Sequence, residues 1–260
     1  MLDQVFMGDV SITIVGCGDA MGTGGRNNTC FLIDDDLGRF AIDFGASSLV
    51  ALNARSINPD TIDAVFLTHF HGDHFGALPN LLLMREYGSD SKRPLTIAGP
   101  PGLEKRIINL CEAVFPGMWK PDWSFSLDMI EIVPGKPVEV FGRTIVTHPV
   151  NHYAGPEPST ALRIETSGKT IAFSGDTGWN DVLLEIANGS DIFLCDCFDR
   201  HDKPFEGHLS YDTLLRHAHQ LETKRLIMTH LGPEMINTLE KFEIEQAFDG
   251  LIVDLSDNEA

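Results

Sequence analysis

The chain has 260 residues, 43% of them hydrophobic, and its 19 basic residues stand against 38 acidic ones, a formal net charge of −19. This length and apolar content allow a large buried core, in one compact domain or two. The acidic balance argues against long nucleic acid as a partner, because phosphate backbones are bound through Lys and Arg. A small anionic substrate remains compatible with it, and apart from the short acidic end at 254–260 no charge block suggests a disordered arm.

The N-terminus and the cysteines favour a cytoplasmic protein. Asp3 and Asp9 interrupt the first ten residues, and no basic residue precedes an apolar run, so we expect no signal peptide. The apolar run from Val10 to Val15 is too short to span a bilayer. Five cysteines without a repeated spacing predict no disulfide framework and favour a reducing compartment.

The chain opens with a strand, a glycine-rich loop and a hairpin. Residues 11–15 alternate apolar and polar positions, and residues 16–28 hold too many glycines for a helix or strand. A dinucleotide-binding loop would open a helix, whereas residues 29–33 have the pattern of another strand, so we reject that function. After a turn at 36–38, the strand at 39–45 contains Asp43, for which a cap or turn role is favoured over contact with a functional loop.

The most informative stretch follows the buried strand expected at 64–67, and reads Thr68-His69-Phe70-His71-Gly72-Asp73-His74. His69 and His71 are two residues apart, so on extended backbone they point the same way. Gly72 permits a tight turn, after which Asp73 and His74 can diverge towards a second ion. Imidazole and carboxylate together suit zinc, manganese or iron. A histidine-rich surface loop is the alternative, but this spacing after an apolar strand indicates a metal site on a loop before a helix that starts near Leu78.

The middle of the chain contains a strand at 94–100 and a helical stripe of apolar residues that includes Cys111. The aromatic connection at 115–123 could line a pocket, form a dimer contact or cover the sheet, and we favour the cover. Three strands are expected next, at 129–133, 138–141 and 144–147. His148 and His152 then compete as a further ligand, and we prefer His152 because it precedes a loop that can lie over a site.

A hairpin of strands at 160–165 and 169–173 leads into Ser174-Gly175-Asp176-Thr177. An Asp at the end of an apolar strand is well placed to bridge two metals, and a helix cap is the alternative. Cys195 and Cys197 have no second pair to complete a thiolate site, so we expect them to be buried thiols.

The last third of the chain contains one more helix and one more candidate ligand. Ser210 is expected to cap a helix that carries Leu214, Ala218 and Leu221. His217 and His219 lie on that helix and are interpreted as surface residues. His230 closes a final strand. Every ligand candidate therefore lies where a strand runs into a loop: His69, His71, Asp73, His74, His152, Asp176 and His230.

The sequence resembles the metallo-β-lactamase fold superfamily over essentially the whole chain. The resemblance rests on the His-x-His-x-Asp-His motif, His152, the strand end at Asp176 and Met228-Thr229-His230. The glycine-rich opening and Gly207-His208-Leu209-Ser210 are similar to its ribonuclease Z-like and phosphodiesterase branch. This resemblance implies an α/β fold, a four-layer αββα sandwich, in a single domain over residues 1–260. It also implies a possible homodimer.

The resemblance further implies a dinuclear centre of two divalent ions, zinc in the first place, with manganese or iron as alternatives. One ion would be held by His69, His71 and His152, and the other by Asp73, His74 and His230. Asp176 would bridge the two ions. Asp73 and His208 are the implied catalytic residues: Asp73 orients water or takes its proton, and His208 lies outside the metal shell and assists the scissile phosphate.

Two features depart from the ribonuclease branch. Asp196 stands where that branch has a longer acidic residue, and no glycine- and lysine-rich arm for transfer RNA appears between residues 90 and 190. The sequence therefore predicts a metal-dependent phosphodiesterase for a small or short nucleotide-like diester rather than a transfer RNA 3′-processing endonuclease. The alternatives are a hydrolase of esters, thioesters or lactones and an iron-dependent redox protein.

Overall fold

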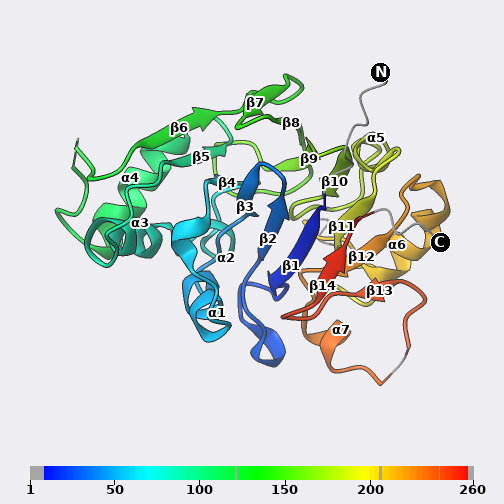
Figure 1. Ribbon diagram of the computed structural model, residues 1–260. Helices are drawn as coiled ribbons and strands as arrows, with labels where there is room; N and C mark the ends of the chain where they lie inside the picture. Colours follow the sequence, from blue (N-terminus) through cyan, green and yellow to red (C-terminus); the bar gives the residue numbers. More distant parts are fainter. Residues whose placement is uncertain (1–8, 121, 205–206, 240, 257–260) are drawn as a thin grey trace, which may run out of the picture.

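The computed structural model describes residues 9–120, 122–204, 207–239 and 241–256. Two seven-stranded sheets pack face to face, and helices cover the outer face of each (Figure 1). This arrangement confirms the predicted α/β, αββα sandwich. The first eight residues, on which the expectation of no signal peptide partly rests, lie outside the described ranges. Within those ranges, no helix combines the length and the apolar character needed to cross a membrane.

The first sheet has the strand order β14-β1-β2-β3-β4-β5-β6. Strands β3 to β6 run parallel, whereas β14, β1, β2 and β3 pair antiparallel. Their bounds are β1 (Ser11–Gly16), β2 (Cys30–Asp35), β3 (Gly38–Ile42), β4 (Ala64–Phe66), β5 (Leu95–Gly99), β6 (Leu127–Glu131) and β14 (Ile252–Asp254).

The second sheet has the order β13-β12-β11-β10-β9-β8-β7, with parallel pairing from β10 to β13 and antiparallel pairing from β7 to β10. Its strands are β7 (Val138–Val140), β8 (Arg143–Pro149), β9 (Thr160–Thr166), β10 (Lys169–Phe173), β11 (Ile192–Asp196), β12 (Leu226–Thr229) and β13 (Glu245–Gln246). The helices are α1 (Ser48–Ala54), α2 (Gly72–Phe75), α3 (Leu78–Tyr87), α4 (Leu103–Val114), α5 (Val182–Ala187), α6 (Tyr211–His217) and α7 (Pro233–Ile236), with short 3₁₀ turns at Thr23–Gly25, Pro59–Thr61 and Ala218–Gln220.

Alternation along the strands explains why the sheets pack on both faces. In β2, Phe31 and Ile33 enter the core between the sheets, whereas Cys30 and Leu32 face the helices. Successive strand side chains point to opposite faces, so a strand that is apolar throughout must be covered on both sides. Phe31 meets Phe173 of the second sheet edge to face, with ring centroids 5.0 Å apart.

The outer layers also follow the sequence pattern. Helices α3 and α4 cover the first sheet, and α5 and α6 cover the second. The aromatic connection at 115–123 packs Met118, Trp119 and Trp123 onto the cluster under α3 and α4, which confirms its interpretation as a cover. Cys111 is buried in the same cluster, and Cys195 and Cys197 are buried free thiols.

Three expected boundaries are wrong. Asp73 and His74 lie on the one-turn helix α2 rather than on a loop, because the amides of His74 and Phe75 both donate to the His71 carbonyl. Phe141 leaves the strand, since it and Gly142 both have positive φ and form the hairpin turn. Helix α6 stops at His217, so Leu221 lies beyond it.

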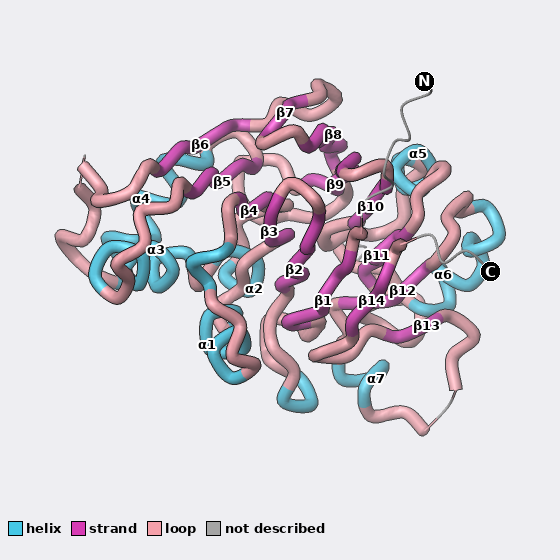
Figure 2. Tube along the Cα trace, viewed as in Figure 1, coloured by secondary structure: helices cyan, strands magenta, loops and turns pink. Residues whose placement is uncertain are grey.

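Figure 2 shows the strands of the two sheets with the helices outside them. The candidate ligands that follow β4, β8, β10 and β12 lie close together, so the ends of these strands meet at one rim of the sandwich. Each of these strands runs directly into a loop with candidate ligands. The opposite rim is closed by Arg143 at the start of β8. Its guanidinium donates to both oxygens of Asp35 on β2 (2.8 and 2.9 Å) and to Asp63 just before β4 (2.9 Å), so it joins the two sheets.

The side chains of Arg143 and Asp35 are both fully buried, so water screens their charges little. We expect Arg143→Met to lower the free energy of unfolding by about 3–5 kcal/mol, because it leaves two carboxylates without their cation. The measurement is urea unfolding followed by circular dichroism. Arg225→Met is the matched control, since it breaks the exposed pair with Glu245 and should cost at most about 1 kcal/mol. Equal losses in the two variants would contradict the inter-sheet role of Arg143.

Candidate metal centre

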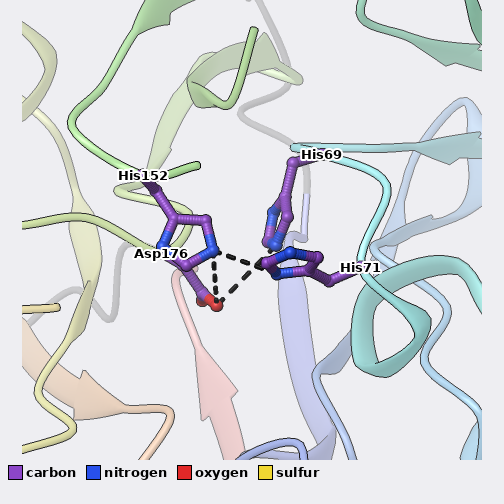
Figure 3. A group of neighbouring side chains, drawn as sticks. All are labelled: His69, His71, His152 and Asp176. Carbon is purple, nitrogen blue, oxygen red and sulfur yellow. Dashed lines mark hydrogen bonds and ion pairs between the residues drawn. The ribbon is translucent and has the colours of Figure 1, made fainter. Parts of the chain in front are cut away.

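All seven ligand candidates meet at the strand-end rim. Their ligand atoms fall into two sets of four, each set within 4.8 Å: His69, His71, His152 and Asp176 in one, and Asp73, His74, Asp176 and His230 in the other. Figure 3 shows the first set, with three imidazoles from two separate loops around one carboxylate. Asp176 belongs to both sets and therefore lies between them.

Asp176 reaches this position because of the glycine before it. Gly175 has φ +60, and a Cβ there would lie 2.7 Å from the Thr160 carbonyl oxygen, so the chain can pass only without a side chain. Asp176 is 2% exposed. Its Oδ2 lies 3.2 Å from Nε2 of His74 and 3.4 Å from Nε2 of His230.

The environment of Asp176 keeps it ionised and excludes a helix cap. Burial alone would raise its pKa, but the surrounding histidines, His230 and His74 foremost, hold the pKa well below the usual range. The next helix, α5, starts six residues further along and has Asp181 at its N-cap. The helix-cap interpretation of Asp176 is therefore wrong.

A hydrogen-bonded chain behind the first two loops orients His74 and His69. The Asp43 carboxylate accepts from Nδ1 of His74 (2.6 Å) and from the amide and hydroxyl of Thr68 (2.8 Å each). The Thr68 hydroxyl in turn lies 3.0 Å from Nδ1 of His69. Fixing Nδ1 leaves Nε2 of each ring directed at the centre, as in metal sites where a carboxylate orients the histidine. The cap-or-turn interpretation favoured for Asp43 is therefore wrong.

His152 and His230 are held in the same way. Nδ1 of His152 donates to the Gly207 carbonyl (2.8 Å), and Nδ1 of His230 lies 3.4 Å from the Thr29 hydroxyl. Asp43 and His230 both have left-handed backbone conformations, with φ of 55 and 54. Residues with side chains rarely adopt this conformation and keep it where the surroundings enforce it, often at functional sites.

The donor set suits divalent cations. Among the described residues, the buried Nε2 of His69 and Oδ1 of Asp176 have no hydrogen-bond partner. Nδ1 of His71 lies 3.1 Å from Nε2 of His152, so ring nitrogens converge on one point. Burial, with the neighbouring His74, holds the pKa of His69 well below its usual range, and a neutral imidazole is the form that binds metal. Buried acceptors without partners are costly unless a cation compensates them.

His208 lies beside the centre and pairs with an acid. Its Nδ1 donates to Asp196 (2.9 Å), and its ring stacks on His230 with centroids 5.1 Å apart. Burial opposes its charge, but Asp196 outweighs burial and raises the pKa of His208 to about 9. Asp196 also accepts from the Thr177 amide (2.9 Å). Although Asp196 is shorter than the acidic residue of the ribonuclease branch, its carboxylate therefore reaches His208 in this chain.

Three other histidines, His148, His217 and His219, lie outside the two ligand sets, and His217 makes a contact that the sequence did not predict. His148, the competitor of His152, lies outside both ligand sets, with Nδ1 3.9 Å from Glu185. His219 is exposed as expected. The expectation for His217 is wrong, because it is partly buried and stacks on Trp179 at a centroid distance of 3.9 Å.

The family described as "Anti-Pycsar protein Apyc1" matches residues 10–252. The chain belongs to the Apyc1 family. An uncharacterized protein of Mycobacterium leprae, ML1173, is 34% identical over 93% of this chain and 84% of its own length. A ribonuclease Z of Clostridium kluyveri is 23% identical over 87% of this chain and 89% of its own. YhfI of Bacillus subtilis, a metallo-β-lactamase fold protein, superposes with a TM-score of 0.78 at 19% identity, covering 95% of this chain and 99% of YhfI.

These relationships confirm the metallo-β-lactamase fold and the likeness to ribonuclease Z. The metal-ligand motifs of the sequence are shared across the superfamily and do not by themselves indicate the Apyc1 family. The His and Asp cluster of this Apyc1 family member suits divalent metal ions.

His152 and His148 offer a direct test of the ligand set. After reconstitution with zinc or manganese, His152→Ala should bind less metal per chain than the wild type, because it removes one nitrogen from the set in Figure 3. His148→Ala is the control, four residues away, and should keep full metal content. Metal is measured by inductively coupled plasma mass spectrometry on folded protein. Full occupancy in His152→Ala would remove His152 from the set.

Proposed function

We propose that this protein is a metal-dependent phosphodiesterase that hydrolyses small or short nucleotide-like diesters. The two ligand sets around Asp176 would hold two divalent ions, with zinc as the first choice. The residues that fit them are His69, His71 and His152 on one side and Asp73, His74 and His230 on the other.

The observation that carries the proposal is the His208–Asp196 pair next to the ligand sets. Nδ1 of His208 donates to Asp196, which leaves Nε2 to meet a substrate oxygen. A phosphodiester needs such a donor, because charge develops on its leaving oxygen and on its non-bridging oxygens. Hydrolysis of a lactone or thioester at the same centre gives His208 no evident task.

Bound divalent ions supply Lewis acidity and bring the pKa of water towards neutrality. Asp73 is the more accessible carboxylate of the cluster, 8% exposed against 2% for Asp176, so water reaches it more readily. Burial raises the pKa of Asp73, but the neighbouring His74, whose Nε2 lies 3.5 Å from Oδ2 of Asp73, outweighs this and lowers the pKa overall. Asp73 is thus an ionised acceptor that orients the attacking water, while His208 donates to the leaving oxygen.

The composition supports a small substrate. A net charge of −19 and the absence of a Lys- and Gly-rich arm between residues 90 and 190 work against the grip on long RNA that ribonuclease Z needs. A homodimer and a cytoplasmic location remain predictions, the first open to light scattering and the second to cell fractionation.

The function is tested by turnover of bis-p-nitrophenyl phosphate against p-nitrophenyl acetate, a thioester and a lactone panel. Protein reconstituted with zinc, manganese or iron is used, and the metal content of each sample is determined. We expect diester cleavage that is fastest at two ions per chain and is abolished by chelation. An inert diester together with an active lactone or thioester would overturn the proposal.

The role of His208 is tested by comparison with another His–Asp pair. We expect His208→Ala to slow diester turnover by about 10²–10⁴, the usual contribution of a general acid, without loss of metal. His201→Ala is the matched control, because His201 also pairs with an Asp at 2.9 Å but is well exposed, and it should turn over like the wild type. Loss of metal in His208→Ala would show that its role is structural.

A further inference from the structure

The backbone of His152 is tied to the segment that carries Asp176. His152 lies in the connection between β8 and β9, next to Asn151, which pairs with Gly178 as an isolated antiparallel bridge. The Gly178 amide donates to the Asn151 carbonyl, and the Asn151 amide donates to Oγ1 of Thr177, over 3.1 Å in each case. One side of this tie thus lies one residue before His152, and the other one residue after Asp176.

This tie fixes a property of His152 that its own hydrogen bond does not. Nδ1 of His152 donates to the Gly207 carbonyl, which sets the rotation of the ring. The position of the ring follows the backbone of Asn151 and His152. Ligand atoms have to be held within about 0.5 Å of their working geometry, so this backbone needs an anchor of its own.

The hydroxyl of Thr177 is the side-chain part of that anchor, and it is fully used inside the protein. Thr177 is 0% exposed. Its hydroxyl donates to the Gly178 carbonyl (2.6 Å) and accepts from the Asn151 amide and from the Asn180 side chain (3.1 Å each). A hydroxyl offers one donor and two acceptor positions, so none is left for a water or a substrate. The group therefore serves to hold the two segments together.

The backbone of Thr177 is held separately from its side chain. Its amide donates to Oδ2 of Asp196 (2.9 Å), the oxygen that also accepts from His208. The place of Asp176 depends on this backbone bond and on the close passage of Gly175. Replacing the hydroxyl should therefore release the bridged segment while Asp176 and the His208–Asp196 pair keep their places.

We propose that Thr177 is a positioning residue whose hydroxyl holds the backbone of Asn151 and so places His152 in the ligand set of Figure 3. The proposal deepens the phosphodiesterase function and rests on it for its bearing on catalysis. The ordinary alternative is a buried threonine that only stabilises the fold. The two differ in what the hydroxyl controls, since a positioning residue changes the affinity of one ion and a purely structural one does not.

Thr177→Val is the first test, because valine has nearly the same shape but no hydroxyl. Its methyl group cannot accept from the Asn151 amide, and at 2.6 Å from the Gly178 carbonyl oxygen it would push the segments apart. Metal-free protein is titrated with zinc by calorimetry in the presence of a competing chelator. Relative to the wild type, one ion should bind about 10- to 100-fold more weakly, the usual cost of removing a group that supports a ligand. The other ion should bind as in the wild type, because the second ligand set does not contain His152.

A double variant shows whether the effect passes through His152. His152→Ala already removes the nitrogen that the hydroxyl places. Thr177→Val should therefore cost no further zinc affinity in the His152→Ala background, since the effects of two changes on one path do not add. Additive losses, equal weakening of both ions, or wild-type affinities in Thr177→Val would overturn the proposal.

Two threonine variants are matched controls. Thr177→Ser keeps the hydroxyl and should bind both ions like the wild type, and weak binding in this variant would contradict a role for the hydroxyl. Thr147→Val removes a hydroxyl that is also buried, on β8, but has no hydrogen-bond partner in the described part of the chain, and it should bind like the wild type. Thr177→Ala removes the hydroxyl without the clash and should weaken the same ion, so the test does not depend on the folding of Thr177→Val.

The two proposals fail in different ways. If the wild type binds zinc but cleaves no diester, the phosphodiesterase function is wrong, and the titrations still decide the role of Thr177. If diesters are cleaved but Thr177→Val holds both ions like the wild type, only the positioning role is wrong.

Discussion

The rest of the structure depends on one buried carboxylate. Asp176 is almost fully enclosed, and a lone carboxylate there would be very costly to bury. The imidazoles that surround it follow the ends of three different strands, β4, β8 and β12. Two apolar sheets supply the rigid frame, and the parallel strands bring their carboxyl ends to the same rim. The fold therefore tolerates this concentration of polar groups because only the rim, and not the core between the sheets, has to hold them.

Orientation is a separate problem from proximity, and the chain solves it with the second ring nitrogen. Asp43, Thr68 and Gly207 each engage an Nδ1 atom, so the opposite nitrogen of each ring faces inward. Asp196 engages Nδ1 of His208 in the same way. A hydrogen bond to Nδ1 thus orients both the candidate ligands and the neighbouring donor His208. The need for these partners explains why buried polar residues are concentrated behind the rim.

The sequence located the side chains that meet at the rim, because strand ends followed by His or Asp leave a local signal. His148 and His152 show the limit of such signals, since only the path of the chain after Pro149 decides which of them turns inward. Asp43, Thr29 and the stack of His217 on Trp179 could not be found from sequence. Their roles arise from contacts between segments 31, 201 and 38 residues apart. The one-turn helix α2 was also missed, because four residues are too few for a periodic pattern.

Arg143 gives the sandwich a second fixed end. The cation closes the two sheets at the rim furthest from Asp176, and the aromatic contact of Phe31 with Phe173 joins them in between. The two sheets are therefore joined at two opposite rims, by the ligand candidates at one and by Arg143 at the other, and the two sets of contacts are independent of each other. The joining of the two sheets at Arg143 therefore needs no bound ion, and we expect metal loading to follow folding as a local event at the opposite rim.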